Sequence, residues 1–95
     1  MEIYINILRS AGGTVVAACD KEVLGRTFSE GDLQLEVKED FYCGELKDLL
    51  AVLRDATMAN FSGNRVVGYA VSQGLIDEKS VLVIGGIKHA QLVLM

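Results

Sequence analysis

The chain has 95 residues, of which 51% are hydrophobic and 23% charged. This length allows one domain, and the hydrophobic content excludes intrinsic disorder. Nine basic and thirteen acidic residues give a net charge of −4, which disfavours generic nucleic-acid binding because such binding needs a basic surface. No apolar run approaches the ~18 residues of a membrane-spanning helix, and the first residues lack the features of a signal peptide. We therefore expect a cytoplasmic protein, away from membranes, with a single domain over residues 1–95.

The first part of the chain has the period-two pattern of half-buried strands. Strands or short strands are predicted at 1–8, 14–19, 26–28 and 33–37. Glycines between the first two runs predict a hairpin turn. After the second run, Asp20 can cap and Gly25 can end one short helical turn. The second run is therefore expected to pair antiparallel with the first.

The pattern then changes to the period of a helix. From Glu45 to Ala56, apolar residues recur at i, i+3, i+4 and i+7, which predicts an amphipathic helix of about four turns. After a break, Ser62 is a candidate cap for a second helix, which ends at Gly74. Residues 81–95 read as a hairpin with a Gly-Gly turn.

These elements predict an α+β fold with the order β-β-β-α-α-β-β. We expect a largely antiparallel sheet of about five strands, with two helices between the third or fourth strand and the C-terminal hairpin. The apolar faces predict a core of Ile3, Ile5, Ile7, Val16, Leu33, Leu35, Val37, Leu46, Leu50, Leu53, Val67, Val71, Val83 and Leu92.

The single histidine, His89, is the starting point for any acid–base or metal chemistry. By alternation it shares a strand face with Gln91. One interpretation is a partly buried histidine that is hydrogen-bonded within the sheet. The other is a polar His89–Gln91 pair on a surface that faces a ligand.

The two cysteines do not suggest a metal or catalytic site. Cys19 lies in an apolar run and is expected in the core. Cys43 precedes a predicted helix, where a thiol can become reactive, but a nucleophile would also need His89 within reach. Their spacing fits no zinc site, and the glycine pair at 85–86 is followed by a strand, unlike a phosphate-binding loop. We expect no cofactor, metal or catalytic residue.

The most polar cluster lies at residues 60–65. Asn60, Asn64 and Arg65 stand near the start of a predicted helix, whose free N–H groups can hold a phosphate or carboxylate. The alternative is an ordinary connection between two helices, capped by Ser62. For a small local RNA contact, these three residues and Lys88 are candidates, with Tyr42 or Phe61 as a stacking surface.

Several stretches in combination resemble a small archaeal family that is catalogued as a domain of unknown function (number 424). They are LGRTFSEGDLQLEV (24–37), FYCGE (41–45), ATMANFSGNRVVGYAVSQGLID (56–77) and IGGIKHAQLV (84–93). Cys43 and Lys88 depart from the family pattern, which has glycine and proline there. The resemblance implies an archaeal cytoplasmic protein with no assigned activity and supplies no catalytic residues. A link to translation or RNA machinery would suit such a protein.

Two functions follow as hypotheses. The first is a non-catalytic binding or adaptor module that binds a protein partner, or itself, through the apolar edge of the hairpin at 81–95. The second is a small enzyme or metabolite-binding protein that uses His89, Gln91 and Arg65. Convergence of these three side chains on one pocket would favour the second.

Overall fold

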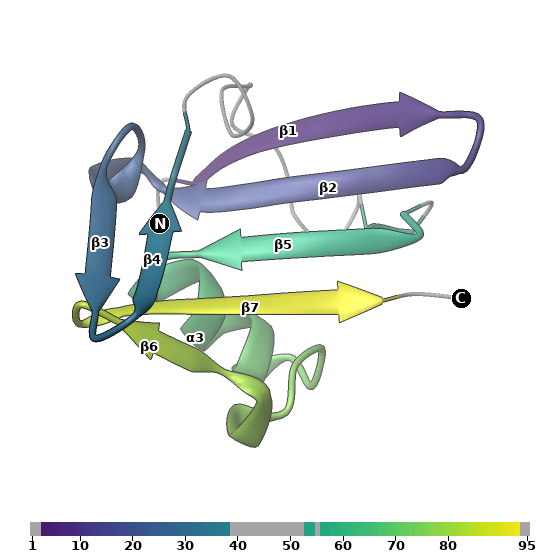
Figure 1. Ribbon diagram of the computed structural model, residues 1–95. Coiled ribbons are helices and arrows are strands. Elements are labelled where there is room, and N and C mark those ends of the chain that lie inside the picture. The colour runs from purple at the N-terminus through teal and green to yellow at the C-terminus, as the bar shows by residue number, and fades with distance from the viewer. Residues whose placement is uncertain (1–2, 39–52, 55, 94–95) are drawn as a thin grey trace.

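A computed structural model describes residues 3–38, 53–54 and 56–93 (Figure 1). In chain order its elements are β1 (Ile3–Ser10), β2 (Gly13–Asp20), the 3-10 helix η1 (Lys21–Val23), β3 (Thr27–Glu30), β4 (Leu33–Glu36), β5 (Met58–Ser62), α3 (Asn64–Ser72), the 3-10 helix η2 (Glu78–Ser80), β6 (Leu82–Ile84) and β7 (Ile87–Val93). The fold is α+β.

Five of the strands form one sheet in the order β1-β2-β5-β7-β6 (Figure 1). The pairs β1–β2, β5–β7 and β6–β7 are antiparallel, whereas β2 and β5 are parallel. The sheet is therefore mixed. Strands β1 and β6 lie at its two edges.

Both predicted hairpins are present. Strands β1 and β2 pair along their whole length, with Ser10 opposite Gly13. Strands β6 and β7 are joined through Gly85 and Gly86, whose φ angles of 58° and 81° are both positive. Two positive φ angles in a two-residue turn match the twist of the strands that it joins, and glycine adopts them without strain.

The predicted arrangement of the central elements is wrong. Residues 58–62, expected to lie at the break between two helices, form strand β5 in the middle of the sheet. The alternation of apolar and polar residues in this segment indicates a strand only weakly, because Ala59 is small and Asn60 and Ser62 are typical of turns. Parallel pairing with β2, distant in the sequence, holds this segment extended.

The sheet and helix assignments also need correction. Strands β3 and β4 form a separate two-stranded sheet rather than extending the main one. Helix α3 is the α-helix whose bounds lie within the described residues, and it follows β5 where the second helix was expected. Most of the first predicted helix lies outside the described residues, although Leu53 and Ala56 on its apolar side are buried.

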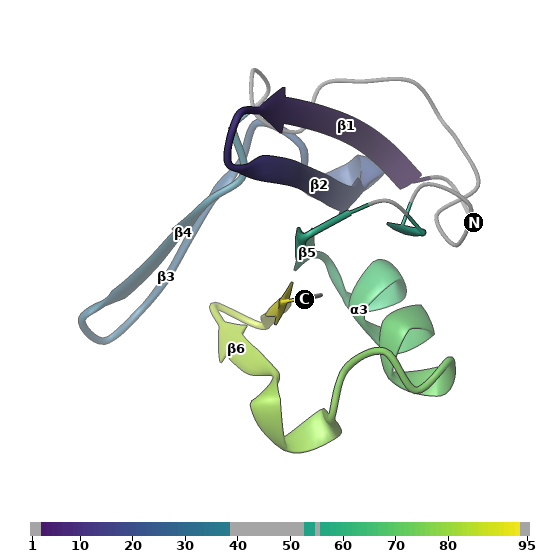
Figure 2. The same cartoon turned by 90° about the vertical axis from the view of Figure 1, so that its right-hand side faces the viewer.

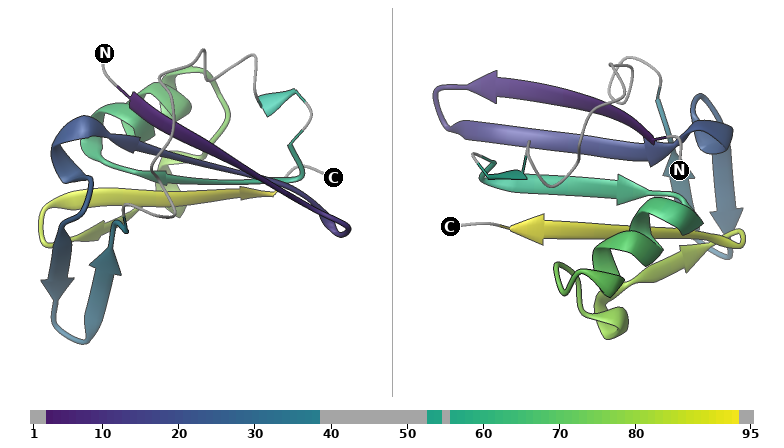
Figure 3. Two further views of the ribbon diagram at one scale, coloured as in Figure 1. Left: turned by 90° about the horizontal axis from the view of Figure 1, so that it is seen from above. Right: turned by 180° about the vertical axis from the view of Figure 1, so that it is seen from behind.

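The main sheet lies between two different layers. Helix α3 covers one face, and the β3–β4 hairpin projects from the other, as Figures 2 and 3 show. Between the sheet and α3 lies the larger core, which includes the fully buried Phe61, Val66 and Val67. A smaller core under the hairpin includes Cys19 and Leu35. No helix of the described segments is both long and apolar enough to cross a membrane.

Most of the predicted core residues that the structure describes are at least partly buried. The buried ones are Ile3, Ile5, Val16, Leu35, Val37, Leu53 and Val67, and the partly buried ones are Ile7, Val71 and Leu92. Leu33 and Val83 are instead 51% and 46% exposed. Leu46 and Leu50 lie outside the described residues. Val83 lies on β6, at the edge of the main sheet.

Candidate functional site

The N-terminus of α3 is occupied by a carboxylate of the chain itself. The backbone N–H of Arg65 donates to Oδ2 of Asp20, and that of Val66 donates to Oδ1, each at 2.8 Å. Asp20 is almost completely buried at the end of β2. Because these N–H groups already have an anionic acceptor, this helix start is not the free anion site that the sequence suggested.

The backbone at Gly63 makes room for this carboxylate. Gly63 has a φ of 125°, and a Cβ at that position would lie 2.5 Å from Cγ of Asp20. A side chain would therefore collide with the carboxyl group. The predicted cap, Ser62, belongs instead to β5.

The polar residues at the start of α3 also have structural partners. The Nδ2 group of Asn64 donates to the carbonyl of Gly86, and its Oδ1 accepts from the backbone N–H of Lys88. Nη1 of Arg65 lies 2.8 Å from Oε1 of Glu22, in an exposed ion pair. Asn64 thus links the start of α3 to the β6–β7 turn through two hydrogen bonds.

His89 lies in the sheet, on the face away from α3. It stands opposite Ser62 in the β5–β7 pairing, and its Nδ1 is 2.8 Å from Ser62 Oγ, within hydrogen-bond distance. Burial lowers the pKa of His89 below its ordinary value of 6.5, and a backbone hydrogen bond at Phe61 opposes this effect. At pH 7 His89 is therefore neutral, as in the interpretation of a hydrogen-bonded histidine within the sheet.

The Ser62–His89 pair lacks the access that a nucleophile needs. Ser62 has no exposed surface, so a substrate atom has no path to its Oγ. Cys19, opposite Ser62 in the β2–β5 pairing, is also fully buried. Burial and the nearby charge of Asp20 raise the pKa of this thiol to about 12, so it is not a thiolate at neutral pH.

A groove of about 410 Å³ lies between β4 and the β6–β7 hairpin; we call it the hairpin groove. Its lining includes Leu33, Leu35, Leu82, Ile84, His89 and Gln91. The predicted pair His89 and Gln91 thus meets in one groove, while Asn60 stands opposite Gln91 on the neighbouring strand. Arg65 is not among the lining residues. The structure therefore does not unite the three residues proposed for a small enzyme.

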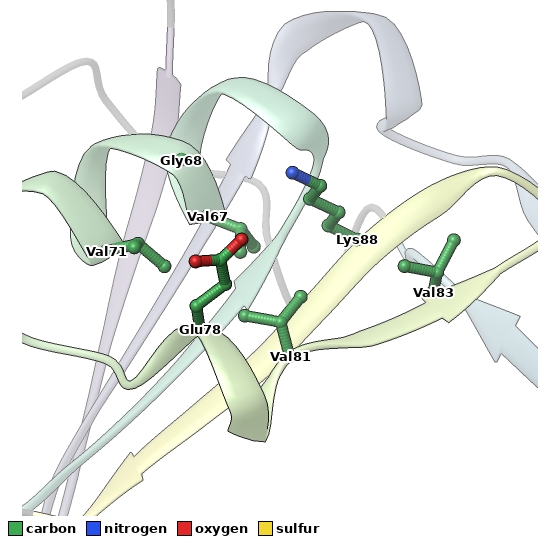
Figure 4. Close-up of a pocket in the computed structure, with 7 residues that line it drawn as sticks. All are labelled: Val67, Gly68, Val71, Glu78, Val81, Val83 and Lys88. Carbon is green, nitrogen blue, oxygen red and sulfur yellow. The ribbon is translucent and has the colours of Figure 1, made fainter.

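A second groove, of about 290 Å³, lies between α3 and the β6–β7 hairpin (Figure 4). We call it the valine groove. It is lined by Val67, Gly68, Val71, Glu78, Val81, Val83 and Lys88. Four of these residues are valines, and Glu78 and Lys88 add one carboxylate and one ammonium group to the lining. The sequence does not indicate this groove, because residues from α3, η2, β6 and β7 form it together.

Strand β6 separates the two grooves. Leu82 faces the hairpin groove and is 53% exposed, whereas Val83 faces the valine groove on the opposite side of the strand. The strand has three residues, all apolar, at the edge of the main sheet. Natural edge strands are commonly protected by charged residues, proline or bulges, and β6 itself carries no charged residue or proline.

The candidates for RNA contact do not all lie on one surface, although Asn64 accepts a hydrogen bond from the backbone of Lys88. Phe61 is completely buried and cannot stack on a base. Asn60 and Lys88 lie on opposite faces of the sheet, since Asn60 shares its face with Gln91 and Lys88 lines the valine groove. Arg65 is engaged by Glu22. Tyr42 and Cys43 lie outside the described residues.

Comparison with known proteins gives a family and a fold. No curated protein matches the chain. A solved structure of an uncharacterized conserved protein from Methanopyrus kandleri is similar, with a TM-score of 0.75 and 22% identity over 100% of this chain and 95% of that one. At this identity the likeness concerns the fold alone. The model of the family described as "Protein of unknown function (DUF424)" matches residues 8–95, and the chain therefore belongs to this family.

Proposed function

We propose that the protein is a non-catalytic binding module that holds an extended segment of a partner protein as an additional strand beside β6. The observation that carries the proposal is an exposed apolar edge strand with a groove on each of its faces. In strand addition, backbone hydrogen bonds supply affinity, and alternate side chains enter pockets on the two faces. Strand β6 offers both elements of this binding mode.

The backbone groups of β6 that point away from β7 belong to Val83. In an antiparallel hairpin with a two-residue turn, the closing pair Ile84–Ile87 exchanges both hydrogen bonds. The next pair, Val83–Lys88, does not, so the N–H and C=O of Val83 point away from β7. A residue placed directly opposite Val83 can therefore form two backbone hydrogen bonds.

The length of β6 favours a short segment over a large interface. Three residues at about 3.3 Å each span roughly 10 Å. Stable interfaces between two folded proteins commonly bury about 1,200–2,000 Å², which so short an edge does not supply. An extended segment gains additional contact by placing side chains in both grooves.

The second candidate, a small enzyme or metabolite-binding protein, has less support. His89 and Gln91 meet in the hairpin groove, but Arg65 is paired with Glu22 and is absent from the groove lining. The Oγ of Ser62, the hydroxyl beside His89, is enclosed. The described geometry therefore supports recognition at β6 better than chemistry at His89.

The proposal can be tested with a displayed library of random peptides selected on immobilised protein. We expect enrichment on the wild type and its loss on Val83→Pro, which removes the outward N–H but spares the ladder groups of Leu82 and Ile84. Leu82→Lys, a second variant, places a charge on the edge without changing the backbone. The matched control is Val93→Lys, since Val93 is 60% exposed but lines neither groove.

Folding of each variant is checked by its thermal melt. Enrichment that persists equally on the folded Val83→Pro and Leu82→Lys variants would contradict the proposal. So would a selection in which the wild type enriches no sequence.

A further inference from the structure

We propose that the hairpin groove selects the segment that binds beside β6, and that it takes a large uncharged aromatic side chain, tryptophan or tyrosine, from that segment. This inference rests on the proposed function and deepens it, because it names the side chain that the partner supplies. The side chain belongs to the residue that follows the one paired with Val83.

The hairpin groove is closed at one end and open at the other. Near the β6–β7 turn the β3–β4 hairpin packs on the sheet, so that a Cβ at Gly85 would lie 3.0 Å from a backbone oxygen of β3. Leu35 and Ile84 are buried at this closed end. Toward its tip the hairpin diverges from the sheet, as Figure 2 shows. There Leu33 on β4 and Leu82 on β6 are 51% and 53% exposed.

The open end of the groove is an apolar surface that continues to the free edge of the sheet. Its two exposed leucines come from different sheets, and Val83, on the opposite face of β6, is also exposed. Single exposed apolar side chains are ordinary, whereas a group of them in one place marks an interaction surface. The open end therefore belongs to the same surface as the proposed site of strand addition.

An added strand directs one side chain to this open end. When an antiparallel segment pairs one residue with both outward groups of Val83, the next residue of the segment stands opposite Leu82. That pair is not hydrogen-bonded, and the side chains of such pairs lie closest together. Leu82 stands opposite His89, on the face of the hairpin groove, so the added residue shares this face. Figure 1 shows the hairpin tip level with β6, so a long side chain here extends between Leu82 and Leu33.

The lining of the groove favours an uncharged aromatic side chain. The described residues that line it include no Asp, Glu, Lys or Arg, and burial keeps His89 neutral at pH 7. A charged side chain would lose water there without gaining a partner of opposite charge. Leucine and isoleucine side chains favour an apolar body, and His89 and Gln91 supply hydrogen-bonding groups. Tryptophan and tyrosine combine a large ring with one polar group, and a groove of about 410 Å³ admits them.

Tryptophan serves as the probe because the chain itself contains none. The capped peptide Thr-Thr-Thr-Val-Trp-Thr-Thr-Thr is compared with the same peptide carrying lysine in place of tryptophan, by titration with a fluorescent label at physiological salt. We expect the tryptophan peptide to bind at least about tenfold more tightly, because its ring leaves water in the complex whereas an ammonium group stays solvated. In the unlabelled peptide, tryptophan emission is expected to shift to shorter wavelength on binding.

Leu33→Gln tests the groove without changing β6, and its matched control is Leu8→Gln. Leu8, on β1, is also exposed but lines neither groove. Thermal melts check that both variants are folded. Leu33→Gln is expected to lose most of the preference for the tryptophan peptide and most of the emission shift, whereas Leu8→Gln keeps both.

The outcomes separate this inference from the proposed function. Equal affinity of the wild type for both peptides, with binding still lost in Val83→Pro, would overturn the inference and leave strand addition intact. A tryptophan preference that is as strong in Leu33→Gln as in the wild type would also overturn it. Binding unaffected by Val83→Pro, or no binding of either peptide, would count against the proposed function itself.

Discussion

Replacing Asp20 by Asn tests the cap that joins β2 to α3. The carboxylate accepts two backbone N–H groups at 2.8 Å each, in an almost completely buried position. An asparagine keeps one acceptor but turns an NH₂ group toward the other N–H, and it removes the negative charge at the start of the helix. Losing one charged hydrogen bond and part of the interaction with the helix dipole costs about 2 kcal/mol.

Urea denaturation followed by circular dichroism measures this change in the free energy of unfolding. In a thermal melt, the melting temperature is expected to fall by roughly 8–16 °C. The control is Asp77→Asn, because Asp77 caps the exposed turn η2 through a 3.0 Å bond from the N–H of Lys79. That substitution should cost less than about 1 kcal/mol. A free energy of unfolding for Asp20→Asn within about 0.5 kcal/mol of the wild type would refute the role given to this carboxylate.

Three further predictions concern stability. Gly63→Ala places a side chain on a residue with a φ of 125° and against Asp20, so we expect the free energy of unfolding from urea denaturation to fall by at least about 2 kcal/mol. A near-neutral effect would contradict the close approach of Gly63 to Asp20. Burial lowers the pKa of His89, so below pH 6.5 the folded state binds fewer protons than the unfolded state, and the stabilising contribution of the neutral histidine is complete above that pH and is lost as pH falls. The difference in free energy of unfolding between the wild type and His89→Gln should therefore change between pH 7 and pH 5. A difference that stays the same would contradict this prediction. Burial raises the pKa of Cys19 to about 12, so above pH 9 the thiol ionises in the unfolded state but not in the folded one. The free energy of unfolding should therefore fall by up to about 1.4 kcal/mol per pH unit relative to Cys19→Ala. Parallel profiles of unfolding free energy against pH for the two proteins would argue against a buried thiol.

The sequence predicts the elements whose pairing is local. The β1–β2 and β6–β7 hairpins follow from period-two alternation on both sides of short glycine turns. The pair of His89 and Gln91 on one face follows from the same alternation, and the structure places both in one groove. Helix α3 lies within the predicted second helix.

What the sequence does not predict depends on contacts between distant residues. Strand β5 is extended because β2 and β7 flank it, although Asn60 and Ser62 favour turns locally. The cap of α3 comes from Asp20, 45 residues before Arg65, and no spacing rule indicates such a partner. Alternation likewise places Val83 on a face but does not tell whether anything covers it.

Backbone amide exchange at Val83 tests the central claim most directly. The N–H of Val83 is expected to exchange freely in the isolated protein. It is expected to become protected when a peptide selected from the displayed library saturates the protein, because the added strand accepts its hydrogen bond. NMR chemical shifts should change at β6, Glu78 and Lys88, with Asn60 and Arg65 unaffected. If the peptide binds while the Val83 amide keeps its rate of exchange, strand addition at β6 is contradicted.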